Sequence, residues 1–390
     1  MLDATYASAE AALAEEVRRA FDAGTPLEIN GGGTRAALGG PVQAEKTVST
    51  AGLSGVSLYE PGALTLVAGA GTPLSEIEAA LAAEGQRLAF EPMDHRKLLG
   101  TDGEPTIGAV AAMNNSGPRR IQAGAARDAM LGVRFIDGRG DVIRNGGRVM
   151  KNVTGYDLVK LLAGSWGTLG LLTEVALKVL PAPETSATLR IEGLDDMAAV
   201  AAMSAALTSP FDVTGAAHLV KGPEGAPVTM VRVEGFETSV AYRAEKLRAA
   251  LAEFGGAEIE RDVEKQNGAW AYVRDVEPFA NADGAVWRVS VRPSDGPAMV
   301  AALGPGFEAY YDWGGGLVWL RTAEEGDAGA AAIRAETKAR GGHATLVRAS
   351  TAVRAAVAVF EPESAPVAAL SARLRAEFDP KSILNPGRMG

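Results

Sequence analysis

The chain has 390 residues, more than the ~150 of an average domain, which predicts two domains or one long composite domain. Its composition, 47% hydrophobic and 22% charged, excludes an intrinsically disordered chain. A formal charge of -10 disfavours nucleic acid and anionic lipid as general partners. Because the chain has no cysteine, it has no disulfides, no cysteine nucleophile and no iron–sulfur cluster held by its own thiolates.

The N-terminal residues carry several acidic side chains and no basic segment before an apolar run, so we expect no secretory signal and a cytoplasmic location. No uninterrupted apolar stretch approaches ~18 residues. We therefore expect any contact with the inner face of the cytoplasmic membrane to be peripheral and made through partners. Glycine is abundant, with 47 residues against ~27 at average usage, which predicts many tight turns and backbone segments that lie against a ligand.

The first part of the chain, residues 1–182, predicts helices and strands separated by glycine-rich loops. Apolar residues recur at every fourth position from Leu13 to Phe21, which is typical of an amphipathic helix. Glycine and proline interrupt residues 87–124 so often that we expect a long functional loop system there. The expected elements, in chain order, are a helix over 8–22, strands over 27–29 and 64–68, a helix from the N-cap Thr72 to Gly85, a hairpin over 132–143 and a strand over 173–179.

The second part, residues 183–348, shows one pattern twice. Residues 186–261 predict strand, helix, strand, strand, helix and strand, and after a helix near 262–275 the same order recurs over 286–347. These two β-α-β-β-α-β halves predict a cap domain with an antiparallel sheet and helices on one face, in a protein of the α+β class. The last part, 349–390, predicts a helix over 366–378 and an irregular end that returns to the first domain.

The loop Asn30-Gly31-Gly32-Gly33-Thr34 offers consecutive backbone N–H groups with almost no side-chain volume, an arrangement that lets a loop surround phosphate oxygens. Taken alone, three glycines favour a flexible turn, because glycine-rich loops are common. The Rossmann and P-loop forms are poor fits, since no Gly-x-Gly-x-x-Gly runs into a helix and no Gly-Lys-Ser/Thr end is present. A phosphate site at this loop would therefore belong to another architecture.

Two further glycine-rich blocks follow this loop, one within residues 106–132 and one comprising 151–158 and 164–173. In this order, and with the terminal Asn385-Pro386-Gly387-Arg388, the blocks resemble vanillyl-alcohol-oxidase-type flavoproteins, whose FAD-binding domain is of the PCMH type. The resemblance covers nearly the whole chain. Within that family the sequence is similar to FAD-binding subunits of bacterial glycolate oxidases, on the basis of its length, its 287–290 strand and its 341–345 segment.

The resemblance implies a two-part PCMH-type domain that binds FAD non-covalently, because Thr34 stands where relatives attach the flavin to histidine and no cysteine is present. We expect no metal site, because the histidine-rich motif of related dehydrogenases, which resembles a metal or base site, is not found here. Given a diphosphate at the loop, a branched side chain at Gly32 is expected to occupy the space that the diphosphate needs. The residues implied to bind FAD are Asn30, Gly31, Gly32, Gly33, Thr34, Thr106, Ile107, Gly108, Ala109, Asn114, Ser116, Gly117, Arg120, Gly124, Arg127, Asp128, Gly170, Leu171, Thr173, Asn385 and Arg388.

Two residues are candidates for catalysis. His343 is a candidate general base, although a structural histidine is favoured because no second histidine or acidic cluster supports it. Arg288 stands on an expected strand, where its guanidinium fork could grip a substrate carboxylate if its face looks at the flavin. A surface arginine on an exposed sheet face is an equal alternative.

Other cations and aromatic residues have simpler interpretations. The flavin edge needs a donor or a positive charge, for which several arginines are candidates, but Arg119 is better interpreted as one partner of a surface ion pair. Trp313 and Trp319 are interpreted as core or interface packing.

The resemblance implies a subunit that takes part in the oxidation of glycolate to glyoxylate and in electron transfer to an iron–sulfur subunit, beside a larger paralogous FAD dehydrogenase subunit. Two alternatives stay open. The chain could be a non-catalytic FAD-binding scaffold that stabilises the paralogous subunit, or a stand-alone FAD-dependent D-2-hydroxy acid dehydrogenase. Dehydrogenase relatives that act on 2-hydroxy acids carry a histidine-rich motif in the second domain, and its absence here argues against the last alternative.

Overall fold

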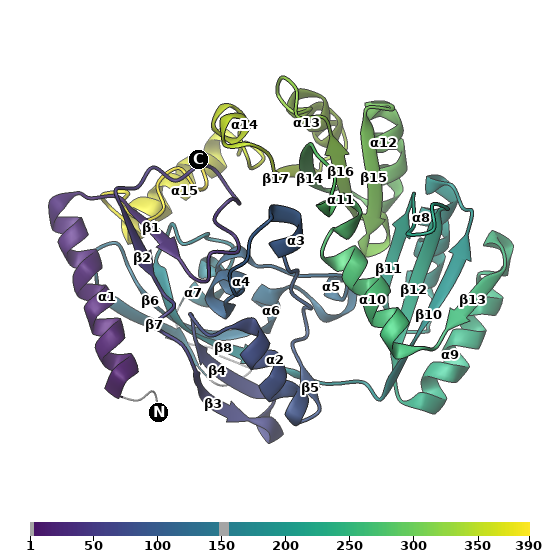
Figure 1. Cartoon of the computed structure of the whole chain (residues 1–390), viewed down its shortest axis with the longest axis horizontal. Helices are drawn as coiled ribbons and strands as arrows, with labels where there is room; N and C mark the ends of the chain where they lie inside the picture. The colour runs from purple at the N-terminus through teal and green to yellow at the C-terminus, as the bar shows by residue number, and fades with distance from the viewer. Residues whose placement is uncertain (1–3, 148–155) are drawn as a thin grey trace.

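The computed structural model describes residues 4–147 and 156–390 and places two large β-sheets side by side (Figure 1). The first is a five-stranded antiparallel sheet with the order β3-β4-β8-β6-β7. Two smaller pairs accompany it, β1 with β2 in parallel and β5 with β9 antiparallel. Their bounds are β1 (Leu27–Asn30), β2 (Lys46–Ser49), β3 (Val56–Glu60), β4 (Thr65–Gly69), β5 (Gln86–Arg87), β6 (Met130–Ile136), β7 (Val142–Gly146), β8 (Leu171–Lys178) and β9 (Leu180–Pro181).

Most helices of this part pack on the five-stranded sheet, whose edge strands are β3 and β7. The predicted N-terminal helix is confirmed, and its residues Val17 and Ala20 pack against Leu27 and Leu171. The predicted N-cap at Thr72 is wrong, because the Thr72 hydroxyl donates a hydrogen bond of 2.7 Å to the Gly69 carbonyl and the helix begins after Pro73. The bounds are α1 (Ala4–Ala23), η1 (Pro61–Ala63), α2 (Leu74–Ala83), α3 (Arg96–Leu99), α4 (Ile107–Met113), α5 (Arg120–Ala123), α6 (Ala126–Ala129) and α7 (Leu158–Leu162).

The second sheet has eight strands in the order β13-β10-β12-β11-β15-β16-β14-β17, all antiparallel. The two predicted β-α-β-β-α-β halves are confirmed, and they join where β11 pairs with β15. The bounds are β10 (Thr185–Glu192), α8 (Asp196–Thr208), β11 (Val213–Leu219), β12 (Val228–Gly235), α9 (Glu237–Ala250), η2 (Ala252–Phe254), β13 (Ala257–Glu260), α10 (Val263–Arg274), α11 (Glu277–Ala280), β14 (Ala285–Ser290), η3 (Pro293–Asp295), α12 (Gly296–Leu303), β15 (Phe307–Asp312), η4 (Trp313–Gly315), β16 (Leu317–Thr322), α13 (Ala330–Ala339) and β17 (His343–Arg348).

The two faces of the eight-stranded sheet have different neighbours. Trp287 is fully buried in a core shared with α8, α9, α12 and α13, which confirms repeat helices on one face. Val286, on the other face, shares a second core with α10, α11 and residues of the first part such as Met93 and Leu98. Because side chains alternate along a strand, Arg288 lies on the same face as Val286. That face looks toward the five-stranded part.

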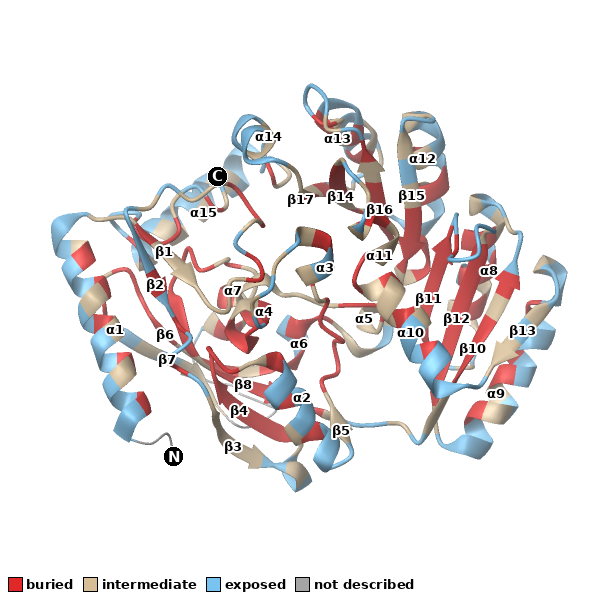
Figure 2. Cartoon of the chain, viewed as in Figure 1, coloured by how far each residue is buried: buried red, intermediate tan, exposed pale blue. Residues whose placement is uncertain are grey.

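The end of the chain returns to the first strand. Leu27 N–H donates to the Ile383 carbonyl at 2.7 Å, and Asn385 N–H donates to the Leu27 carbonyl at 2.9 Å. Before this point, α14 (Thr351–Ala356) and α15 (Ala365–Phe378) lie across the surface, and α15 has no buried residue (Figure 2). Among the described ranges, no helix is both long and apolar enough to cross a membrane.

Candidate functional site

A cavity that opens to solvent lies between β1, the loop that follows it, α4 and the C-terminal segment. Four segments that are distant in the sequence supply its walls, namely 28–36, 108–113, 166–172 and 385–388. The predicted site residues that it brings together are Asn30, Gly31, Gly32, Gly33, Thr34, Gly108, Ala109, Gly170, Asn385 and Arg388.

The glycine loop presents unused backbone donors to this cavity. Gly33 has a positive φ of 79° and donates its N–H to Asn30 Oδ1 at 3.1 Å. Within the described part of the chain, the N–H groups of Gly31, Gly32 and Thr34 have no acceptor. The buried Thr106 hydroxyl, adjacent to Gly31, has no partner there either. Such a set of free donors suits the oxygens of a diphosphate.

The structure corrects the reason for glycine at position 32. A Cβ atom on Gly32 would overlap with the carbonyl oxygen of Glu104, and one on Gly103 would overlap with the carbonyl oxygen of Gly32. The expected clash with a diphosphate is therefore not the first constraint, because protein backbone already fills that space. A Cβ atom on Gly33 would meet nothing within 4 Å, although the positive φ there still favours glycine.

The two C-terminal residues fasten the cavity walls together. Asn385 accepts the Ile29 N–H at 2.7 Å and donates to the Trp166 carbonyl at 2.8 Å. Arg388 donates to two carbonyls of the loop after β1 at 2.7 and 2.8 Å, and to Glu28 Oε1 at 2.9 Å. Burial lowers the pKa of Arg388, and Glu28 opposes that shift. Protein acceptors engage both side chains, so these residues shape the cavity rather than present free donors to it.

Several predicted residues of the second block support a helix instead of lining the cavity. Asn114 Oδ1 accepts the Arg127 N–H at 2.8 Å, and Ser116 Oγ accepts the Ala126 N–H at 2.9 Å. Asp128 accepts the backbone N–H that precedes α6 at 2.9 Å. These contacts fix the path of the chain after α4. The other predicted residues outside the lining are Thr106, Ile107, Gly117, Arg120 and Gly124.

The side chains of β8 that face the cavity are not the ones expected from the sequence. Leu171 is fully buried against α1, and the Thr173 hydroxyl donates to Glu10 at 2.6 Å, so neither side chain lines the cavity. Leu172 lies between them on the strand and does line it. The reason is the packing of α1, which buries the opposite face of β8.

Some lining residues were missed in the sequence. Trp166 and Gly167 line the cavity and lie inside the glycine-rich block 164–173. A tryptophan next to a glycine in that block was the sequence feature that could have indicated them. Thr50, Ala70 and Met113 carry no sequence signal for this role. Residues 151–155 of the third block lie outside the described residues.

The candidate catalytic residues lie apart from the lining. Arg288 is half-buried where the eight-stranded sheet meets the first part, so the alternative of an exposed sheet face is wrong for it. His343 is exposed at the start of β17, opposite Ser290 in the register. Burial and then Arg288 lower the pKa of the His343 imidazole. Trp319 packs in the core as predicted, stacked on Tyr310.

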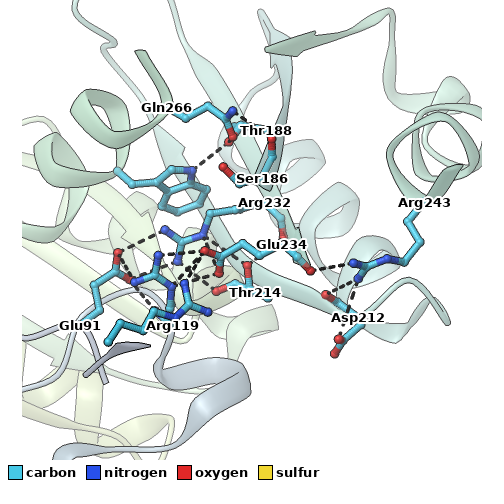
Figure 3. Close-up of polar contacts among 12 residues, drawn as sticks. Glu91, Arg119, Ser186, Thr188, Asp212, Thr214, Arg232, Glu234, Arg243 and Gln266 are labelled. Atoms are coloured by element: carbon cyan, nitrogen blue, oxygen red, sulfur yellow. Dashed lines mark hydrogen bonds and ion pairs between the residues drawn. The ribbon is translucent and has the colours of Figure 1, made fainter. Parts of the chain in front are cut away.

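A buried ion network joins the two parts (Figure 3). Arg232 of β12 donates to Glu91 at 3.1 and 3.2 Å, and Arg119 pairs with Glu91 at 3.1 Å and with Glu234 at 2.9 Å. Arg87 adds a hydrogen bond of 2.7 Å to Glu234. The expectation of a surface ion pair for Arg119 is therefore wrong. Burial raises the pKa of both carboxyl groups, but the arginines lower it overall, Arg232 most strongly.

Comparisons with known proteins place this geometry in a family. The family described as FAD binding domain matches residues 4–146. Glycolate oxidase subunit GlcE of Escherichia coli K12 is 38% identical over 379 residues, which span 97% of this chain and 96% of that protein. The chain belongs to the family of this subunit. It is an FAD-binding oxidoreductase of the PCMH type, and FAD is its cofactor.

Two further proteins extend the comparison. Glycolate oxidase subunit GlcD of Bacillus subtilis 168 is 45% identical over 84 residues, which cover 22% of this chain and 18% of that protein. Among solved structures, 4-ethylphenol oxidase from Gulosibacter chungangensis in an isoeugenol complex has a TM-score of 0.72 at 15% identity, covering 98% of this chain and 87% of that one. This likeness shows a shared fold.

Proposed function

We propose that the chain is the FAD-binding subunit of a complex that oxidises glycolate, or a closely similar 2-hydroxy acid, to the 2-oxo acid. The observation that carries the proposal is the cavity whose glycine loop presents unused N–H donors. Its support comes from the likeness to GlcE over nearly the whole of both chains. The shorter likeness to GlcD supports a larger paralogous flavin subunit as a partner.

The residues present fit FAD. In this proposal Gly31, Gly32 and Thr34 hold the diphosphate through their backbone N–H groups. Apolar side chains such as Leu172 exclude water from the remainder of the cavity. Binding is non-covalent, since the chain has no cysteine and Thr34 stands in the loop where relatives attach the flavin. Bound FAD supplies the ring that accepts two electrons from the substrate.

Electrons leave this chain through a partner. Because the chain has no cysteine, it cannot hold an iron–sulfur cluster with its own thiolates, and we assign that centre to a separate subunit. Oxidation of a 2-hydroxy acid also needs a group that takes the hydroxyl proton. His343 is exposed and does not line the cavity, so it is poorly placed for that task. The isolated chain should therefore turn over slowly, whereas the complex is active.

Two measurements test the proposal. The purified chain should be yellow, and acid precipitation should release FAD into the supernatant. A preparation that stays colourless after incubation with FAD would contradict the flavin site. Anaerobic stopped-flow mixing of the FAD-loaded chain with glycolate should give slow or no bleaching of the flavin band. Bleaching within seconds, lost in His343→Ala, would instead make this chain a dehydrogenase in its own right.

A further inference from the structure

Two arginine side chains rest on one tryptophan ring where the two parts of the molecule meet. The guanidinium carbon of Arg120, on α5, lies 4.6 Å from the centroid of Trp313, and that of Arg288, on β14, lies 5.1 Å from it. The ring is fixed in place, because Trp313 Nε1 donates to the Gly117 carbonyl at 3.1 Å and the Trp313 backbone N–H donates to Asp312 at 2.7 Å. The interpretation of Trp313 as packing alone was therefore incomplete.

No carboxylate in the described part of the chain forms an ion pair with either guanidinium group, although Asp312 raises the pKa of Arg288 and Asp128 raises that of Arg120. Among the described residues, the side chains of Arg120 and Arg288 form no hydrogen bond and no ion pair, whereas Arg119, Arg232 and Arg274 at the same interface each pair with a carboxylate. Burial, followed by the charge of Arg120, lowers the pKa of Arg288 to about 10. Two half-buried like charges are costly unless an anion neutralises them.

The ring that carries the arginine pair and two residues of the cavity wall pack against the same apolar cluster. Met113 and Trp166 line the cavity and also pack against the same apolar cluster as Trp313. Arg120 follows the 114–117 segment that leaves α4, and Arg288 projects from the sheet face that looks toward the first part. An anion bound by both guanidinium groups would therefore receive one cation from each part of the molecule.

We propose that Arg120 and Arg288, both stacked on Trp313, form the binding site for the carboxylate of the 2-hydroxy acid. The inference rests on the proposed function and deepens it, since it reassigns Arg120 from the flavin to the substrate. Arginine forks match a carboxylate bidentately, and stacking on an aromatic ring leaves their in-plane N–H groups free to donate. The site selects carboxylates over neutral alcohols of the same size.

The test uses oxalate, a small carboxylate that the flavin cannot oxidise, titrated into the FAD-loaded chain and followed by tryptophan fluorescence and flavin absorbance. Wild-type protein should bind oxalate, and Arg120→Gln or Arg288→Gln should each raise the Kd about 10- to 100-fold, as expected for a charge-assisted hydrogen bond. Arg120→Lys or Arg288→Lys should raise the Kd for oxalate less than the corresponding glutamine variant does. Arg292→Gln is the matched control, because Arg292 lies near the end of β14 with 74% of its side chain exposed, and it should leave the Kd unchanged.

FAD retention after gel filtration separates this inference from the flavin assignment. Retention should be unchanged in Arg120→Gln and Arg288→Gln, and their thermal midpoints should equal or exceed that of the wild type, because each variant removes one of two like charges. If wild-type protein does not bind oxalate, or if the glutamine variants bind it equally well, the carboxylate site is wrong while the flavin site stands. Loss of FAD with unchanged oxalate binding in Arg120→Gln would return that residue to the flavin.

Discussion

Removing the charge of Glu91 should destabilise the junction between the two parts more than any surface change. Glu91 is 9% exposed and faces Arg232 and Arg119, whose hydrogen bonds and ion pair to it measure 3.1–3.2 Å. Glu91→Gln keeps the size of the side chain but leaves these arginines with one buried carboxylate instead of two. Breaking a buried pair in this way costs ~3–5 kcal/mol, and two charge-assisted hydrogen bonds at ~1.5–3 kcal/mol each give a similar figure.

Urea unfolding followed by tryptophan fluorescence measures this cost as a change in the free energy of unfolding. The matched control is Glu245→Gln, which removes an exposed partner of Arg248 and should cost less than ~1 kcal/mol. A double variant, Glu91→Leu with Arg232→Met, should lower the free energy of unfolding less than Glu91→Gln alone, because it leaves neither charge of that pair without its partner. Equal losses in Glu91→Gln and the control would refute the reasoning.

The same ion network makes the free energy of unfolding depend on pH in the acidic range. The folded-state pKa of Glu91 and Glu234 lies below the ordinary value, so their contribution to stability is fully present above the unfolded pKa of ~4.3 and is lost as the pH falls through the folded-state pKa. The urea midpoint of the wild type should therefore decline below about pH 4.5. Glu91→Gln should show a shallower decline, and an identical pH profile would contradict the assignment.

Three further predictions concern single positions. Gly32→Ala should prevent FAD retention, measured by the ratio of flavin to protein absorbance, because the new Cβ overlaps with the Glu104 carbonyl; Gly33→Ala should retain more FAD. Burial raises the pKa of Asp312 to about 7, so Asp312→Asn should raise the thermal midpoint more at pH 8 than at pH 5, and an equal rise at both would argue against it. Asn385→Ala loses two hydrogen bonds of ~0.5–1.5 kcal/mol each and should weaken FAD binding about tenfold in titrations of the apoprotein.

Local patterns predicted the cap but not the details of the cavity. The repeated order of strands and helices could be predicted because apolar residues recur at different spacings in helices and in strands. That spacing is a property of neighbouring residues in the sequence. The lining by Leu172 instead of Leu171 was not readable, since it depends on which face of β8 receives α1. The predicted N-cap at Thr72 was wrong for a similar reason. The Thr72 hydroxyl accepts the N–H of Gly55, 17 residues earlier, and donates to the carbonyl of Gly69 instead of capping the helix.

The same limit applies to the charged residues. Arg119 has the composition and sequence neighbours of a surface arginine, and only the approach of β12, more than a hundred positions later, buries it beside Glu234. The sequence predicts Arg288 on a strand. It does not predict that, among the described residues, the Arg288 side chain forms no ion pair, because that depends on side chains from distant parts of the chain. The loops that carry the site are therefore easier to predict from the sequence than the roles of individual side chains.

The fastening of residues 383–388 to the first strand has a consequence for biosynthesis. A ribosome completes β1 and its glycine loop at ~5–20 residues per second, yet Asn385 and Arg388 follow the whole cap in the sequence. The cavity then gains its final wall only after the whole cap has emerged. A product that stops before residue 383 lacks this wall of the cofactor site, so flavin content reports whether synthesis has passed the cap.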